Sequence, residues 1–140
     1  MIKGYTDIEQ SKKLAEILPL ESADLWWNES KDYPEFIKTY HEYLSVSIPP
    51  IPCWSLSALL NLLPSEFTQK GKYSTITYKI DIRKYKFTDD VDLHQIAYGS
   101  IKFDVDGQHS FKDMINTGEK ENLIDACVQM IISLKELNLL

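Results

Sequence analysis

The stretch STITYKIDI (residues 74–82) sets the expected fold class, because apolar and polar side chains alternate along it. The apolar members of this pattern are Ile76, Tyr78, Ile80 and Ile82. A period of two residues is typical of a strand that is buried on one face. We therefore predict a strand near residues 73–83.

A second strand is expected near residues 95–105, within IAYGSIKFDV (residues 96–105). The apolar positions change parity at Gly99-Ser100, which predicts a β-bulge at that point. Asp106-Gly107 is a turn signal. The two strands predict a small, mainly antiparallel sheet. After the turn, Ser110 and Asp113 indicate a short helical turn that ends at Gly118.

Helices are expected on both sides of these strands. The longest is predicted over residues 122–137, where Asn122 stands at the cap position before a broad apolar face. A shorter one is predicted over residues 55–63, within IPPIPCWSLSALLNLLP (residues 48–64). The prolines before Cys53 keep the chain extended, Ser55 caps the helix, and Pro64 ends it.

The first helix is predicted over residues 7–18. Thr6 is the expected cap, Glu9 completes a capping box, and Pro19 ends the helix. Residues 20–47 are harder to interpret. ADLWW (residues 23–27) is compatible with a short strand, and residues 33–44 favour a helix over an extended or looped segment.

The whole pattern predicts one α+β domain over residues 1–140, with about three helices packed on the sheet. Its length, 44% hydrophobic content and 26% charged content are those of an ordinary globular chain. No apolar run approaches the ~20 residues that span a bilayer, so no membrane association is expected. The N-terminus has no apolar signal-peptide core, which predicts a cytoplasmic location.

Charge is unevenly distributed along the chain. The net charge is −6, yet residues 70–86 hold six of the 15 lysines and arginines against Asp81 alone. An acidic protein repels phosphate backbones, so we expect no general affinity for nucleic acid. This basic segment is the place where that expectation could fail.

The sequence predicts no catalytic, cofactor-binding or metal-binding residues. Cys53 lies just before a helix, where a thiol can be activated, and the available bases are His41, His94 and His109. Packing of Cys53 beside Trp54 is the favoured interpretation, and Cys127 belongs to the apolar face of the last helix. The cysteines and histidines lack zinc-site spacing, and no phosphate-binding loop motif occurs. DVDGQ (residues 104–108) lacks the glutamate that a calcium loop needs, since Ile115 stands at that position.

Four residues are candidates for partner binding. Trp26 and Trp27 are adjacent, so in a strand they point to opposite faces, and an exposed tryptophan often anchors a partner. Lys79 and Arg83 lie on the outward face of the first predicted strand. Basic and aromatic side chains on such a face can bind single-stranded nucleic acid, although lysines also protect sheet edges from aggregation.

Three blocks of the sequence carry a resemblance, namely EQSKKLAEILPLESAD (9–24), IPCWSLSALLNLLP (51–64) and NLIDACVQMIISLKELNLL (122–140). Together they resemble a group of small uncharacterised proteins carried by prophages and mobile elements of gut bacteria. The resemblance implies a bacterial or phage context and an accessory role. It implies no activity and no catalytic residues.

The leading functional prediction is an accessory protein that binds another protein without catalysis. A nucleic-acid-associated module that uses residues 70–86 is one alternative, and a thiol-dependent enzyme centred on Cys53 is another. The chain ends in three leucines, Leu137, Leu139 and Leu140, and the sequence does not decide whether this segment, residues 137–140, closes a core or a homodimer.

Overall fold

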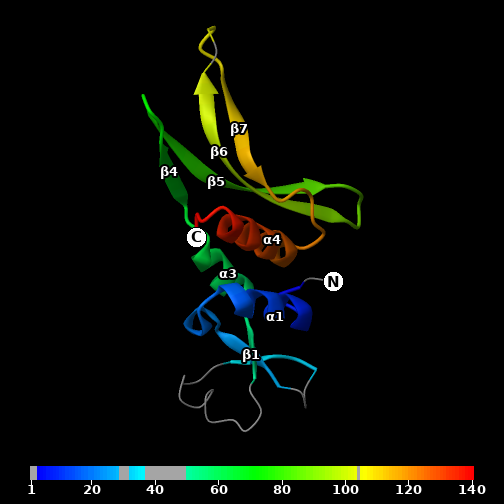
Figure 1. The fold of residues 1–140 in the computed structure, drawn as a ribbon. Helices are drawn as coiled ribbons and strands as arrows, with labels where there is room; N and C mark the ends of the chain where they lie inside the picture. Colours follow the sequence, from blue (N-terminus) through cyan, green and yellow to red (C-terminus); the bar gives the residue numbers. More distant parts are fainter. Residues whose placement is uncertain (1–2, 29–31, 37–49, 104) are drawn as a thin grey trace. The chain divides into compact units, whose positions relative to one another are not determined.

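The computed structural model describes residues 3–28, 32–36, 50–103 and 105–140. These residues form an α+β fold with three α-helices and two antiparallel sheets, of three and four strands (Figure 1). The chain divides into two compact units, Met1–Leu62 and Leu63–Leu140. None of the described helices is long and apolar enough to cross a lipid bilayer.

The described residues of the first unit form two short α-helices and a small sheet. Its elements are α1 (Ile8–Ile17), the 3-10 helix η1 (Leu20–Ser22), β1 (Leu25–Trp27), β2 (Glu35–Phe36), β3 (Ile51–Cys53) and α3 (Leu56–Leu62). Strand β1 is central and pairs antiparallel with both neighbours. The short strand expected within ADLWW is therefore confirmed. Residues 35–36 of the predicted 33–44 helix are extended instead, and residues 37–44 lie outside the described residues.

Helix α1 confirms the predicted helix but not its predicted cap. Asp7 is the cap residue: its carboxylate accepts a hydrogen bond from Gln10 N at 2.8 Å, and Gln10 Oε1 accepts one from Asp7 N at 3.1 Å. The prediction of Thr6 and Glu9 is wrong by one residue. Thr6 is instead buried, and its hydroxyl is shared with Ser11 Oγ, 2.8 Å away, and Trp54 N.

Among the residues of the first unit that the structure describes, Trp54 is the largest fully buried side chain. Its Nε1 donates to Ser22 Oγ at 2.9 Å, and its carbonyl accepts from Thr6 N at 3.0 Å. Helix α3 then begins with the predicted Ser55 cap, whose Oγ accepts from Ala58 N at 3.2 Å. Asp24 holds this cap in place, because its carboxylate accepts hydrogen bonds from both Ser55 N and Ser55 Oγ.

The second unit is a four-stranded meander with one helix. Its elements are β4 (Glu66–Lys70), β5 (Thr75–Lys86), β6 (Asp92–Phe103), β7 (His109–Asn116) and α4 (Leu123–Glu136), and the strand order is β4-β5-β6-β7. The predicted strands, the turn at Gly107 and the last helix are confirmed. The irregularity predicted near Gly99 is confirmed, but the extra residue lies in the partner strand: Tyr98 is in register with Ile115 and Gly99 with Asp113, so Met114 of β7 has no partner in β6.

Strand β7 occupies the segment for which a helical turn was predicted, so that prediction is wrong. Residues 109–116 pair along β6, and this pairing overrides the local signal of Ser110 and Asp113. Strand β4 was not predicted. Of the four apolar residues in the β5 pattern, Tyr78 and Ile80 are half-buried as expected, whereas Ile76 and Ile82 are exposed.

The core of the second unit lies between α4 and the sheet (Figure 1). Ile96 and Tyr98 of β6 are fully buried, as are Cys127 and Ile131 of α4. The Tyr98 hydroxyl donates to Pro64 O at 2.6 Å, and its ring lies 5.2 Å from that of Phe67. Ile96 and Tyr98 are two residues apart in β6, so both side chains point to the same face of the sheet, and this is the face that packs against α4.

Candidate partner-binding cleft

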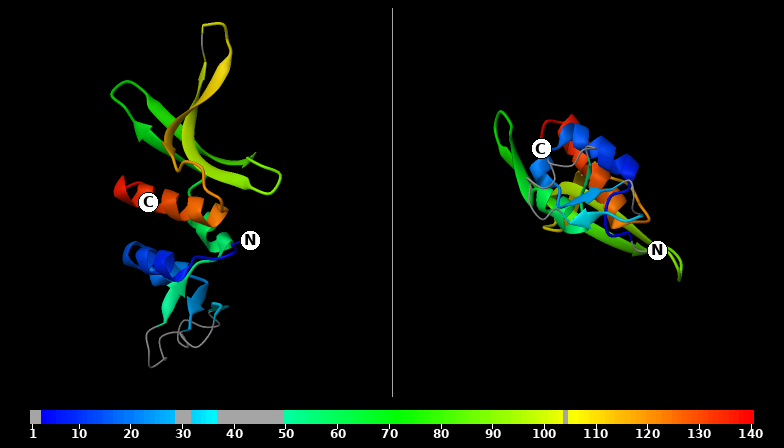
Figure 2. Two further views of the ribbon diagram at one scale, coloured as in Figure 1. Left: turned by 90° about the vertical axis from the view of Figure 1, so that its right-hand side faces the viewer. Right: turned by 90° about the horizontal axis from the view of Figure 1, so that it is seen from below.

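The four-stranded sheet separates into two ribbons at one end. Strands β5 and β6 pair from Lys79 opposite Gly99 to Lys86 opposite Asp92. Among the described strands, β5 pairs only with β4 before Lys79, and β6 pairs only with β7 after Gly99. The β4–β5 and β6–β7 ribbons therefore diverge, as Figures 1 and 2 show from different directions.

The bulge lies where the ribbons part. A bulge bends its strand and increases the local twist, which turns the β6–β7 ribbon away from β5. Gly99 is buried there, and a Cβ at this position would lie 2.3 Å from Lys112 O and 2.5 Å from the Phe111 ring. Only glycine leaves room for the Phe111 ring to lie across the strand.

Replacing Gly99 with alanine is expected to lower the free energy of unfolding by about 2 kcal/mol, because β7 must move to admit the methyl group. Urea denaturation measures this change. Gly4→Ala is the control, since a Cβ on Gly4 meets no atom within 4 Å. Equal stability of the two variants would contradict the close packing of Phe111 on Gly99.

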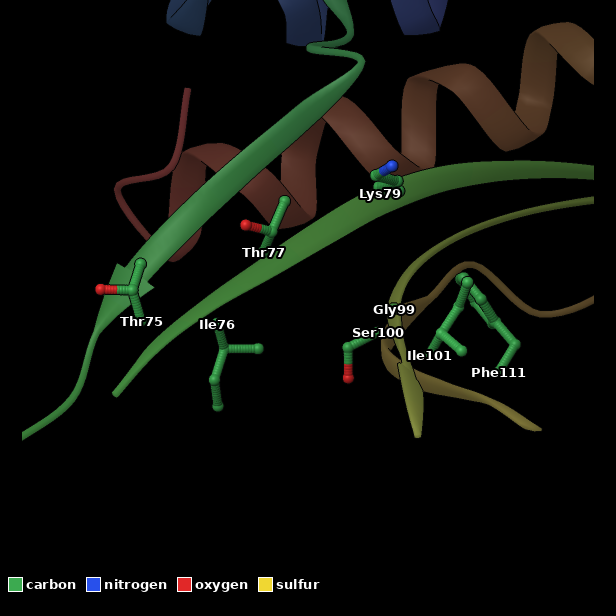
Figure 3. A pocket seen from close by; sticks show the side chains of 8 residues that line it. All are labelled: Thr75, Ile76, Thr77, Lys79, Gly99, Ser100, Ile101 and Phe111. Atoms are coloured by element: carbon green, nitrogen blue, oxygen red, sulfur yellow. The ribbon is translucent and has the colours of Figure 1, made fainter. Parts of the chain in front are cut away.

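A cleft of about 430 Å³ lies between the diverging ribbons. Its size falls within the range of ligand-binding clefts, ~300–1,000 Å³. The residues that line it are Thr75, Ile76, Thr77 and Lys79 of β5, Gly99, Ser100 and Ile101 of β6, and Phe111 of β7 (Figure 3). Ile76, Ile101 and Phe111 are 43%, 55% and 37% exposed, so a concave site gathers three accessible apolar side chains.

One lysine, Lys79, lines the cleft, and two more are in cross-strand register with residues that line it, Lys70 with Thr75 and Lys112 with Ser100. Among the described residues, no ion pair involves any of these three lysines. The one acidic side chain in direct cross-strand register with them is Glu66, opposite Lys79. The cleft therefore carries a surplus of positive charge.

Arg83 does not join this group. Its guanidinium forms two hydrogen bonds with the Asp113 carboxylate, at 2.7 and 3.1 Å, and a third with Asp81 at 2.7 Å. Its pKa is raised chiefly by the hydrogen bonds with Asp113 and then by those with Asp81. The guanidinium carbon also lies 5.4 Å from the centre of the Phe111 ring. Arg83 thus holds β7 and Phe111 in place, and its charge is already compensated.

The ion pair between Arg83 and Asp113 should make the stability of the fold depend on pH, because the hydrogen bonds from Arg83 lower the pKa of Asp113. A lowered pKa stabilises the fold above the unfolded value of ~3.9, and that contribution is lost as the pH falls through the folded value. Between pH 7 and pH 3, Asp113→Asn is expected to lose about 1 kcal/mol less unfolding free energy than the natural chain. Urea denaturation at both pH values checks this difference, and identical losses would contradict it.

The two adjacent tryptophans lie in β1 and are both half-buried. Trp27 Nε1 donates to Thr6 O at 3.3 Å, and its ring meets Tyr5 edge to face at 5.7 Å. Trp26 is in register with Pro52 on one side and Glu35 on the other. Both tryptophans therefore keep part of their surface accessible, and partner binding by either of them stays a prediction.

Both cysteines are fully buried, one in each unit. Cys53 Sγ lies 3.4 Å from Thr6 O and 3.5 Å from Thr6 Oγ1, and burial raises the pKa of this thiol. Burial likewise raises the pKa of Cys127 to about 12. The neutral thiol is favoured at both positions, which opposes nucleophilic attack.

Lys79 and an irregularity near Gly99 could be predicted from the sequence, but the accessibility of Ile101 and Phe111 could not.

Within the described ranges, no three histidine, cysteine, aspartate or glutamate residues are placed to hold a metal ion. No protein-family model matches the sequence, and neither the curated proteins nor the solved structures give a significant match.

Proposed function

We propose that this chain is an accessory protein that binds another protein, without catalysis of its own, at the cleft between the β4–β5 and β6–β7 ribbons. The single observation that carries the proposal is the exposure of Ile76, Ile101 and Phe111 in one concave site. Grouped apolar side chains of this kind are typical of surfaces that a partner covers.

The proposed setting is the bacterial cytoplasm, in the context of a prophage or another mobile element. The resemblance of residues 9–24, 51–64 and 122–140 to small proteins of such elements supports this setting. Many accessory proteins act by occupying a surface of a partner, which requires a recognition site and no catalytic group.

The proposal is tested by pull-down of the tagged, full-length protein from a bacterial lysate, with and without nuclease. We expect a partner protein that survives nuclease treatment, is retained by Phe87→Ser and is lost from Phe111→Ser. Phe87 is a matched control, because it is 70% exposed and is not among the residues that line the cleft. A partner that both variants retain would contradict binding at the cleft.

A nucleic-acid-associated module is the second candidate function. Lys70, Lys72 and Lys79 are exposed on the β4–β5 ribbon, together with Tyr73, over whose ring Lys72 lies at 5.4 Å. Basic side chains beside exposed aromatic rings suit single-stranded nucleic acid. Recovery of nucleic acid, or a partner that nuclease releases, would favour this candidate.

A thiol-dependent enzyme centred on Cys53 receives no support from the structure, because that thiol is fully buried and burial raises its pKa.

A further inference from the structure

We propose that the occupant of the cleft is an extended, acidic peptide segment of the partner, which adds as a strand to the open edge of β5 at residues 75–78. This inference rests on the proposed protein-binding function and specifies the chemistry of the partner. It follows from the direction of the β5 backbone groups, from the opposite wall of the cleft, and from the charge around it.

The β5 backbone presents hydrogen-bonding groups to the cleft. Ile80 N donates to Ser65 O at 3.0 Å, and Gly71 N donates to Ser74 O at 2.7 Å, so these two bonds fix which pairs of the β4–β5 ladder are hydrogen-bonded. In an antiparallel ladder the hydrogen-bonded pairs alternate along the strand. The N–H and C=O groups of Thr75 and Thr77 therefore point away from β4, toward the cleft.

Among the described strands, none pairs with β5 on that side before Lys79. An open strand edge of this kind is a template for an added strand. Strand addition supplies affinity through backbone hydrogen bonds, and pockets for alternate side chains supply specificity.

The opposite wall of the cleft provides such a pocket. Ile101 and Phe111 come from the β6–β7 ribbon and line the same cleft as Thr75 and Thr77 (Figure 3). A strand paired with β5 would direct every second side chain to one face of the sheet. We expect apolar residues of the peptide to contact Ile101 and Phe111.

The charge around the cleft selects acidic peptides. Lys70, Lys79 and Lys112 carry no ion pair within the described part of the chain, whereas the protein as a whole has a net charge of −6. Complementary charge speeds association and excludes partners of the wrong sign. A segment with aspartate or glutamate beside its apolar residues meets both requirements.

The backbone edge favours a peptide over a nucleic acid. Thr75 and Thr77 each offer a donor and an acceptor toward the cleft, and a second peptide strand offers the matching acceptor and donor. Phosphate oxygens can accept from the N–H groups but can give nothing to the C=O groups. Phosphates would then pair with only half of the polar groups of this edge, whereas a peptide strand pairs with all of them.

The test begins with selection of random dodecapeptides displayed on phage against the full-length protein. We expect the enriched peptides to be net negative, with apolar residues at every second position. Binding of the synthetic, labelled peptide is then measured by fluorescence anisotropy. Lys79→Glu is expected to weaken it at least tenfold, and Lys86→Glu, an equal change of charge at the exposed far end of β5, which does not line the cleft, to leave it within about twofold.

Strand addition is tested on the ligand, so that the protein need not be altered. Two versions of the selected peptide are N-methylated on alternate residues, one at the odd and one at the even positions. Because the N–H groups of one set alone face β5, we expect one version to lose at least tenfold in affinity and the other to keep it. Equal loss from both versions, or no loss from either, would overturn the strand-addition model.

Other outcomes separate this inference from the proposed function. Enrichment of basic peptides, or of none, would overturn the inference, as would preferential binding of an oligothymidylate or self-association through the cleft. A lysate partner that Phe111→Ser releases, together with acidic peptides that bind elsewhere, would leave the proposed function standing and remove only the inference. Loss of both the lysate partner and the peptide result would overturn both.

Discussion

Replacing Trp54 with alanine is expected to lower the free energy of unfolding by about 3–5 kcal/mol, because the side chain is fully buried. The change removes the indole contacts and leaves a cavity in the first unit. It also leaves Ser22 Oγ without the hydrogen bond that it accepts from Trp54 Nε1. Small domains have a total stability of only ~5–15 kcal/mol, so much of it would be lost.

Urea denaturation followed by far-ultraviolet circular dichroism measures this effect without relying on tryptophan fluorescence. Trp54→Phe is the matched variant, since it keeps an apolar ring and loses only the Nε1 hydrogen bond and part of the volume. We expect it to fall between the natural chain and Trp54→Ala. A Trp54→Ala variant within about 0.5 kcal/mol of the natural chain would be incompatible with a fully buried indole.

The helices could be predicted from the sequence because each carries its own signals. The predicted ranges 55–63 and 122–137 differ from α3 and α4 by one residue at each end. Prolines and apolar periodicity act locally, so no knowledge of the tertiary fold is needed to interpret them. The error at the first helix has a tertiary cause: Thr6 and Asp7 are both good cap residues, but the Thr6 hydroxyl is bonded in the core to Ser11 and Trp54, so Asp7 caps the helix.

Strand β7 could not be predicted in the same way. The register shift at Tyr98/Gly99 puts Ile115 in register with Tyr98 and Asp113 with Gly99, which breaks the alternation of apolar residues along β7. Phe111, Met114 and Ile115 consequently follow helical spacing. The strand exists because β6 pairs with it, and that pairing is not visible in the local sequence.

The cleft shows a similar limit. The sequence predicts an irregularity near Gly99, but it does not show that β5 and β6 stop pairing beyond Lys79. Ile76 was therefore expected on a half-buried face, whereas the divergence of the ribbons exposes it. Lys79 could be named as a candidate from its outward position. Arg83 shared that position, and only the structure shows its ion pair with Asp113.

Both cysteines are expected to react with a thiol reagent at least about 10³-fold more slowly in the native protein than in urea. Cys53 and Cys127 are fully buried, and their pKa values are raised by burial, so labelling requires the surrounding structure to open. Brief labelling followed by proteolysis and mass spectrometry gives the rate at each thiol in the same molecule. Rapid labelling of Cys53 in the native state would contradict its burial and would restore the thiol-enzyme alternative.

The same measurement tests whether residues 1–140 behave as one domain, because each compact unit contains one of the two thiols. A single cooperative domain exposes both thiols at the same free energy of opening and with the same dependence on urea. Two separately stable units expose Cys53 and Cys127 at different urea concentrations. The Trp54→Ala variant sharpens the comparison, since it weakens the first unit directly. Faster labelling of Cys127 in that variant would show that the second unit depends on the first, whereas an unchanged rate would show that the cleft-bearing unit is stable by itself.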